Sequence, residues 1–467
     1  MQYAKSEISA SDSSVKQARS GWLPNISVSA GQQAVGKTSD NGDNQYSVMV
    51  QQNLFDFGRT GDRVDNAKFN KGAQIWQARD DAETVAAKVA EAYFNILKGQ
   101  KLLENNKNEM IEHRRILTLA TARADGGMDN QGDVRQVQVR IKGLEANAEN
   151  IRAQLEATIN EYQILVGKTP GTLEDTSLLF LHSAVSSGLK EKLSQSPQIR
   201  VLQMEQAAAT SEYQYARKSW MPQLSVSLSQ GKTSIYADND TQIMLNVTSE
   251  VFNGGASYFQ AQGAAQKIES ARWKLQKALE DNATNISQLY QQALGYQQES
   301  VIYKSRVNQS LQVMDLYNDQ YRVNRRSVLD LLNAAQEYYD TISNQFTADN
   351  NYSVTMVRAV SKLGKINELF KVNMGIAGDS DIDSKLENQN VIYNSEGTTV
   401  PDAIKQTVRS PVNVTEIVSS APQFAAENNI VVNEDVTILQ ARVSEQKTAP
   451  DNEAPVADIP DPLDLLK

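Results

Sequence analysis

With 467 residues, the chain is long enough for several domains or for one elongated architecture. It has no cysteine, which excludes disulfides, thiolate metal sites and a cysteine nucleophile, and its two histidines, His113 and His182, argue against histidine chemistry. The net charge of −10 lies entirely in residues 372–467, so the neutral remainder has no basic patch for nucleic acid, and no apolar run is long enough for a transmembrane helix.

The chain begins with a helix and a hairpin. Residues 1–21 predict a helix that ends at the Trp-Leu-Pro of residues 22–24, because proline cannot donate a backbone hydrogen bond and disfavours helix in the residue before it. Apolar and polar residues then alternate over 26–30 and again over 46–54, with a polar stretch over 36–44 between them. This alternation predicts two strands joined by a long polar tip.

Residues Gly31 to Thr38 match the phosphate-binding pattern G-x-x-x-x-G-K-[ST]. That motif works because glycine amides and a following helix N-terminus surround the phosphates. Here Thr38 leads into more polar residues rather than a helix, and no parallel α/β sheet is predicted around it. We therefore interpret the stretch as a hairpin tip, and we predict no enzyme, no cofactor and no metal site.

A long helix follows, from Arg59 to about Asp125, and it contains no proline. Apolar residues recur in it every seven positions, which is typical of a coiled-coil seam. At 1.5 Å per residue such a helix is roughly 100 Å long. A glycine-containing turn over 126–132 precedes a second heptad series that ends at Val166-Gly167, so the sequence predicts a returning helix.

The second half of the chain repeats this order. A Trp-Met-Pro at residues 220–222 lies 198 positions after the first junction, and two alternating runs and a long helix follow it. Later landmarks such as Asp330 and Gly364 match Asp133 and Gly167 at an offset of 197. The repetition predicts an internal duplication.

Three segments follow from this pattern. We predict a first repeat over 1–197, a second repeat over 198–371 and a tail over 372–467. The tail is acidic and holds seven of the eleven prolines beyond position 400. This composition predicts that it is largely disordered.

The two hairpins leave two architectures open. Four strands cannot close a barrel alone, and open strand edges are not tolerated in lipid, whereas three chains would supply twelve strands. The alternative is a soluble coiled-coil scaffold that uses its hairpins as interaction tips.

The order of elements resembles the TolC family of outer-membrane efflux proteins over about residues 1–370. The most specific matches are A-R-S-x-x-L-P (18–24), L-F-D-F-G (54–58) and Y-R-V-N-R-R-S-V-L-D-L-L-N-A (321–334). The resemblance implies a mixed α and β fold, in which a twelve-stranded membrane β-barrel continues into a long periplasmic barrel of coiled coils. It also implies a homotrimer in outer-membrane lipid that docks on a periplasmic adaptor protein and an inner-membrane transporter. Such a duct serves small-molecule efflux or type I protein secretion, and we favour secretion.

The same resemblance implies a gated periplasmic entrance. By motif match, Tyr321, Arg326 and Asp330 occupy its second-half positions and Asp133 the first-half partner position, so Arg326 and Tyr321 are expected to pair with Asp133 between neighbouring coiled coils. A threefold ring of Asp330 would favour cations. The family often has another acid one turn later, where this chain has Asn333, and we expect a weaker cation trap.

One departure from the family concerns the N-terminus. Members begin with a signal peptide and a fuller first helix, whereas residues 1–7 lack the basic-then-apolar layout of such a peptide. The resemblance therefore implies a chain shortened at its N-terminus.

Overall fold

The computed structural model describes residues 2–32, 44–174, 193–233, 236–370 and 378–395. The chain divides into two compact units, Met1–Ile392 and Tyr393–Lys467, and the arrangement described below is that of the first unit. In these described ranges, no helix is both long enough and apolar enough to cross a membrane.

The elements follow the predicted order in each half. The first half contains α1 (Gln2–Arg19), the 3-10 turn η1 (Ser20–Trp22), β1 (Asn25–Gln32), β2 (Asn44–Phe55), α2 (Arg59–Asp125) and α3 (Gln131–Val166). The second half contains α6 (Pro197–Arg217), β3 (Gln223–Thr233), β4 (Tyr236–Thr248), α7 (Ala256–Arg322), α8 (Val328–Lys362) and the short α9 (Ile366–Leu369). A further helix, α10 (Ser380–Ser395), follows.

The predicted duplication is confirmed by the lengths and ends of the long helices. Helices α2 and α7 have 67 residues each, and their starting positions, 59 and 256, keep the offset of the sequence repeat. Each begins after a glycine in the left-handed conformation, Gly58 with φ of 80° and Gly255 with φ of 85°. A side chain would strain the backbone there, so the same turn leads from strand to helix in both halves.

The four strands form one antiparallel sheet in the order β1-β2-β3-β4. The β2–β3 pairing joins the two halves, and its register aligns apolar residues across the sheet: Val50 lies opposite Leu228, which lies opposite Ile243. These residues share one face of the pleat, and the other face carries mainly serines, with Met49 and Met244 among them. The apolar face is open to solvent in one chain, because Ile243 is 76% exposed.

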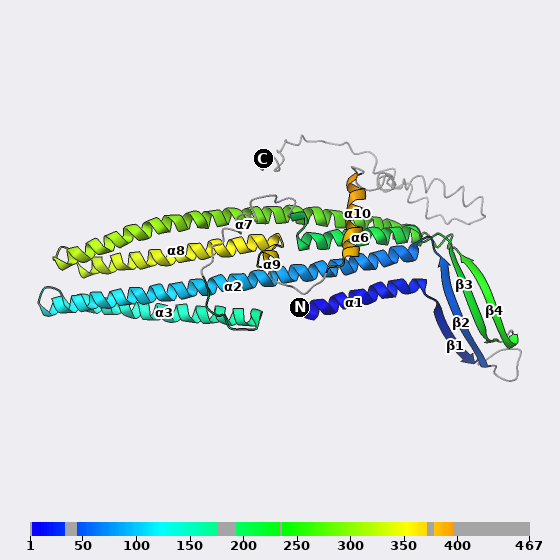
Figure 1. Cartoon of the computed structure of the whole chain (residues 1–467), viewed down its shortest axis with the longest axis horizontal. Helices are drawn as coiled ribbons and strands as arrows, with labels where there is room; N and C mark the ends of the chain where they lie inside the picture. Colours follow the sequence, from blue (N-terminus) through cyan, green and yellow to red (C-terminus); the bar gives the residue numbers. More distant parts are fainter. Residues whose placement is uncertain (1, 33–43, 175–192, 234–235, 371–377, 396–467) are drawn as a thin grey trace, which may run out of the picture. The chain divides into compact units, whose positions relative to one another are not determined.

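The helices associate in pairs. Helix α2 packs on α3 and α7 packs on α8, and α2 also contacts α8, which brings the two pairs together (Figure 1). Two apolar clusters lie along this contact. One contains Phe94, Ile286 and Val357, and the other lies near the ends of the helices around Ile116, Tyr321 and Leu331.

Helix α10 lies within the predicted tail. Its side chains Ile382 and Leu386 are buried in a cluster with Phe69 and Met204, and the Trp76 indole N–H donates to Asp383 at 3.1 Å. The start of the predicted tail is therefore helical and packed, because it carries two apolar residues one turn apart, whereas 396–467 lies outside the described residues.

Several predicted loops lie outside the described residues as well. These are most of the first hairpin tip (33–43), residues 234–235 of the second, and the stretch 175–192, which includes His182. Of the phosphate-binding lookalike, Gly31 and Gln32 end β1, and its second-half counterpart, Gly231 to Thr233, belongs to β3. Lys37 and Thr38, which would have to lead into the helix of such a site, lie outside the described residues.

Candidate functional site

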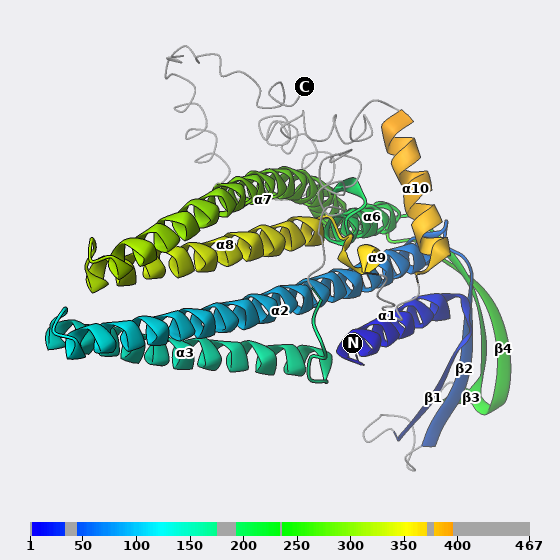
Figure 2. The same cartoon turned by 60° about the vertical axis from the view of Figure 1, so that its left-hand side comes forward.

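The two helix turns farthest from the sheet form one end of the first unit, which we call the tip (Figures 1 and 2). The first turn is residues 126–130 between α2 and α3, and the second is 323–327 between α7 and α8. Asn130 caps α3 by accepting from the Gly132 N–H at 2.8 Å. Ser327 and Asp330 form a reciprocal capping box on α8, so both turns have defined geometry.

Tyr321 is the central side chain of the tip. It is 1% exposed and packs among apolar residues of all four long helices. Its hydroxyl donates to Asp129 Oδ2 at 2.6 Å. Burial is the main cause that raises the pKa of Tyr321 above its ordinary value, and the hydrogen bond to Asp129 raises it further. The phenol therefore stays a hydrogen-bond donor.

Arg123 connects the two turns. Its guanidinium lies 4.5 Å from the Tyr321 ring centroid and donates to Asp129 Oδ2 at 3.0 Å. It also donates to the Tyr321 carbonyl at 2.6 Å and to Asn324 Oδ1 at 2.5 Å. Asn324 has a positive φ of 62°, a conformation that asparagine tolerates well. We call Arg123, Asp129, Tyr321 and Asn324 the tip network, and it ties the first half to the second.

Sequence reasoning missed Arg123 and Asp129. Their roles depend on a contact between helices far apart in the chain, which periodicity does not show. One local signal was available: an arginine and an aspartate flank a turn that contains two glycines, a spacing that allows an ion pair across the turn.

The predicted residues Arg326 and Asp330 lie together on the outer side of the second turn. Arg326 stacks on the Tyr317 ring at 4.3 Å from its centroid and donates to Gln320 Oε1 at 3.1 Å. Its Nη1 is 4.0 Å from Asp330 Oδ2, and both side chains are partly open to solvent. Hydrogen bonds from Ser327 hold the pKa of Asp330 below its ordinary value, so its charge is retained.

Among the described residues, no hydrogen bond or ion pair joins Asp133 or Asn333 to Arg326 or Asp330. Asp133 lies in the first turn of α3. Asn333 is exposed on α8 and lies 3.5 Å from an Arg140 nitrogen. Within the protomer the Tyr321 hydroxyl binds Asp129 rather than Asp133. The pairing of Arg326 and Tyr321 with a neighbouring chain's Asp133 stays a prediction.

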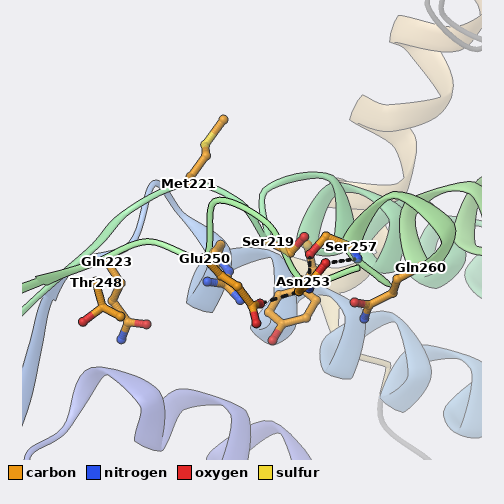
Figure 3. A pocket seen from close by; sticks show the side chains of 10 residues that line it. Ser219, Met221, Gln223, Thr248, Glu250, Asn253, Ser257 and Gln260 are labelled. Atoms are coloured by element: carbon orange, nitrogen blue, oxygen red, sulfur yellow. Dashed lines mark hydrogen bonds between the residues drawn. The ribbon is translucent and has the colours of Figure 1, made fainter. Parts of the chain in front are cut away.

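A small polar pocket of about 220 Å³ lies where β3 and β4 meet α7 (Figure 3). Inside it, Asn253 accepts from the Ser257 N–H at 3.1 Å and donates to Glu250 at 3.2 Å. Asp56 accepts from the Thr60 N–H at 2.7 Å at the equivalent place in the first half. Because both halves use the same hydrogen bond to begin a long helix, we attribute the pocket's polar groups to helix capping.

Comparison with known proteins identifies the architecture. The model of the family described as outer membrane efflux protein matches residues 1–167 and 188–364. Protein CyaE of Bordetella pertussis is 26% identical over 296 residues, which are 59% of this chain and 61% of that protein. Outer membrane protein TolC of Salmonella enteritidis is 23% identical over 384 residues, 76% of this chain and 77% of that protein.

A solved structure has the same fold. The CmeC outer membrane channel of Campylobacter jejuni has a TM-score of 0.67 at 13% identity, covering 83% of this chain and 85% of that chain.

Proposed function

The chain belongs to the outer membrane efflux protein family, and we propose that three copies of it assemble into a passive exit duct that is gated at the tip. It is a non-enzymatic channel of the TolC type, from a family of trimeric outer-membrane channels that extend into the periplasm.

The sheet carries this proposal. Its outer strands, β1 and β4, each have one edge without a partner strand in the described chain. Its apolar face is bare, since Val28 is 74% exposed and Leu245 is 67% exposed. Such a sheet is unstable alone in water or in lipid. Pairing β4 of one copy with β1 of the next satisfies every edge, and three sheets of four strands then close a barrel with its apolar face toward lipid.

The other face of the sheet suits a water-filled passage. Ser27, Ser29 and Ser47 lie on it, and so do Ser225 and Ser227. In the closed assembly the exposed hydroxyls of this face line the interior beside Met49 and Met244, and they hydrogen-bond to water without attracting either sign of charge. Specificity then comes from the partners that deliver the cargo.

The tip is the proposed periplasmic entrance. Arg326 is exposed and Asp330 is partly exposed at the end of the helix pair α7–α8, and Asp133 lies at the start of α3. These groups are available to neighbouring copies, and three Asp330 carboxylates around an axis would favour cations. A periplasmic adaptor protein that docks on the helix pairs would release these weak contacts, and an inner-membrane transporter would supply the cargo. We propose that the cargo is a small molecule or, by preference, a protein secreted in one step.

One experiment tests the assembly. Particles solubilised in detergent should image as a threefold tube on the order of 100 Å or longer, because the helices of 67 residues alone reach that length. In planar bilayers the same particles should conduct ions. A chain that is monodisperse and fully folded in buffer without detergent would instead support the soluble scaffold.

A further inference from the structure

The contact between α2 and α8 changes character behind the tip. Every buried residue of α2 between Gly99 and Ile116 is polar: Asn105, Asn106, Glu109 and His113. We call these four residues the polar seam. Apolar clusters lie on both sides of it, one around Phe94 and one around Ile116, and Figure 2 shows α2 and α8 running along each other through this region.

Two of the four residues are compensated by hydrogen bonds. The Asn105 side chain donates to the Tyr339 carbonyl at 2.8 Å and to Ser343 Oγ at 2.9 Å, which links α2 to α8. The His113 Nδ1 lies 3.0 Å from the Glu109 carbonyl. Burial lowers the pKa of His113, so the imidazole stays neutral at neutral pH and provides no positive charge.

Glu109 is not compensated. The side chain is 7% exposed, and in the part of the chain that the structure describes its carboxylate accepts no hydrogen bond and forms no ion pair. The Asn106 amide beside it also lacks a partner there. The Glu109 carboxylate keeps only slight contact with solvent, and such a largely buried carboxylate without a hydrogen-bond donor favours its neutral form.

Charged and titratable groups reach Glu109 from each helix packed against it. Arg140 on α3 is the nearby cation, but it donates to Gln336 Oε1 at 2.6 Å. Asp340 and Tyr339 face Glu109 from α8, and on α2 itself Glu112 pairs with Arg115. Burial and the Asp340 carboxylate raise the pKa of Glu109 from its ordinary 4.5 to about 7, against the opposing effect of Arg140.

We propose that the polar seam is a proton-operated lock, in which protonated Glu109 holds the two helix pairs of a protomer together and its deprotonation loosens them. The lock differs from the tip network, because it lies along the α2–α8 contact rather than at the turns. It deepens the proposed duct, since separation of these pairs would widen the entrance.

The direction of the pH effect follows from the position of the charge. When the seam is packed, Glu109 holds its proton up to about pH 7, whereas in a loosened, solvated seam it releases the proton near its ordinary value of 4.5. The packed seam therefore loses stability as the pH rises from about 4.5 to about 7, by up to tenfold in population for each pH unit. At low pH, protonation of the buried His113 has the opposite effect and disfavours the packed seam.

The test compares the wild-type chain with Glu109→Gln, which keeps the shape and removes the titration, in the full-length detergent-solubilised protein. The matched control is Glu104→Gln, an exposed position on the same helix. Comparing variants at the same pH cancels the intrinsic pH dependence of hydrogen exchange. At pH 8 the wild-type seam should show amide hydrogen exchange at least about tenfold faster than Glu109→Gln. At pH 4, below both pKa values of Glu109, the two should agree, and Glu104→Gln should follow the wild type at both pH values.

Conductance supplies the second measurement. In planar bilayers the open fraction of the wild type should rise from pH 6 to pH 8, and that of Glu109→Gln should stay low. A pH response in Glu109→Gln equal to that of the wild type overturns the lock, and so does an exchange difference without a conductance response. If no variant conducts, the proposed duct is wrong, while hydrogen exchange still decides whether Glu109 controls the seam.

A second variant, Asp340→Asn, tests the lock independently in case Glu109→Gln does not fold. Asp340→Asn removes the like charge that faces Glu109, so the midpoint of the pH response should move to lower pH while the response persists. An unchanged midpoint would contradict the assigned surroundings of Glu109.

Discussion

The two turns of the tip share one backbone and differ in their side chains. In the first turn the Met128 N–H donates to the Arg123 carbonyl at 2.8 Å, and in the second the Arg325 N–H donates to the Gln320 carbonyl at 2.8 Å. Gly127 and Asn324, which are equivalent positions, both have positive φ. The duplication therefore preserved the shape of the turn in both halves.

The side chains across each turn have diverged. The contact between Arg123 and Asp129 in the first turn corresponds to the contact between Gln320 and Arg326 in the second, so the charge at the later position is reversed. The first turn uses its arginine to bind the other half of the chain. The second turn presents its arginine to solvent, at 39% side-chain exposure. One turn holds the protomer together, and the other is available to neighbours.

The largest effect is expected from removing Tyr321, the buried side chain of the tip network. Tyr321→Ala removes a fully buried ring and the donor to Asp129, and we expect a loss of about 3–5 kcal/mol of tip stability. Hydrogen exchange at both turns in the intact protein measures it. Tyr317→Ala, one turn earlier on α7 and only partly buried, is the matched control and should lose far less. Equal losses would mean that the tip network does not centre on Tyr321.

Exchanging the side chains of the two turns sharpens the comparison. Arg123→Gln with Asp129→Arg gives the first turn the chemistry of the second and removes the bonds to Tyr321 and Asn324. We expect a loss of about 2–4 kcal/mol, because hydrogen bonds to charged groups contribute about 1.5–3 kcal/mol each and are not additive. The reciprocal exchange, Gln320→Arg with Arg326→Asp, alters one exposed and one partly exposed side chain and should cost at most about 1 kcal/mol. Similar costs for the two exchanges would mean that the turns do not differ in role.

Substitutions of Asp330 and Asn333, at the start of α8, are expected to affect conduction more than folding. Asp330→Ala should weaken the block of conductance by divalent cations in planar bilayers, and loss of its capping box should cost about 1 kcal/mol of stability. Asn333→Asp adds a carboxylate on the adjacent helical face and should strengthen the block. Unchanged block in Asp330→Ala would remove that residue from the cation site.

Much of the fold could be predicted from the sequence, because it depends on local and periodic signals. The ends of α2 at Arg59 and Asp125 and the glycine at 167 were predicted from heptads and turn residues. The packed helix α10 was not predicted, since an acidic tail with only two apolar anchors gives a weak periodic signal. Its burial depends on a groove between α2 and α6, where Gly72 has no side chain to block Ile382.

The residues of the tip also fall into those that the sequence predicted and those that it did not. Tyr321, Arg326 and Asp330 were named from a motif, and the structure brings Arg326 and Asp330 together, but Arg123 and Asp129 were not found. An arginine near the end of a helix is consistent with many roles. The acceptors of Arg123 in the second half, the Tyr321 carbonyl and Asn324, come from a turn far along the chain, and no residue spacing predicts that contact.

The smallest expected effect lies at the other end of the helices, where the halves agree. The Gln52 amide donates to the Trp22 carbonyl at 2.7 Å, and at the equivalent place Ser249 Oγ donates to the Trp220 carbonyl at 3.0 Å. Gln52→Ala and Ser249→Ala should each lose about 0.5–1.5 kcal/mol, measured as thermal stability of the detergent-solubilised assembly. Similar small losses would mean that duplication kept the junction symmetric while the tip diverged. A loss at only one junction would show that the asymmetry of the molecule extends to its membrane end.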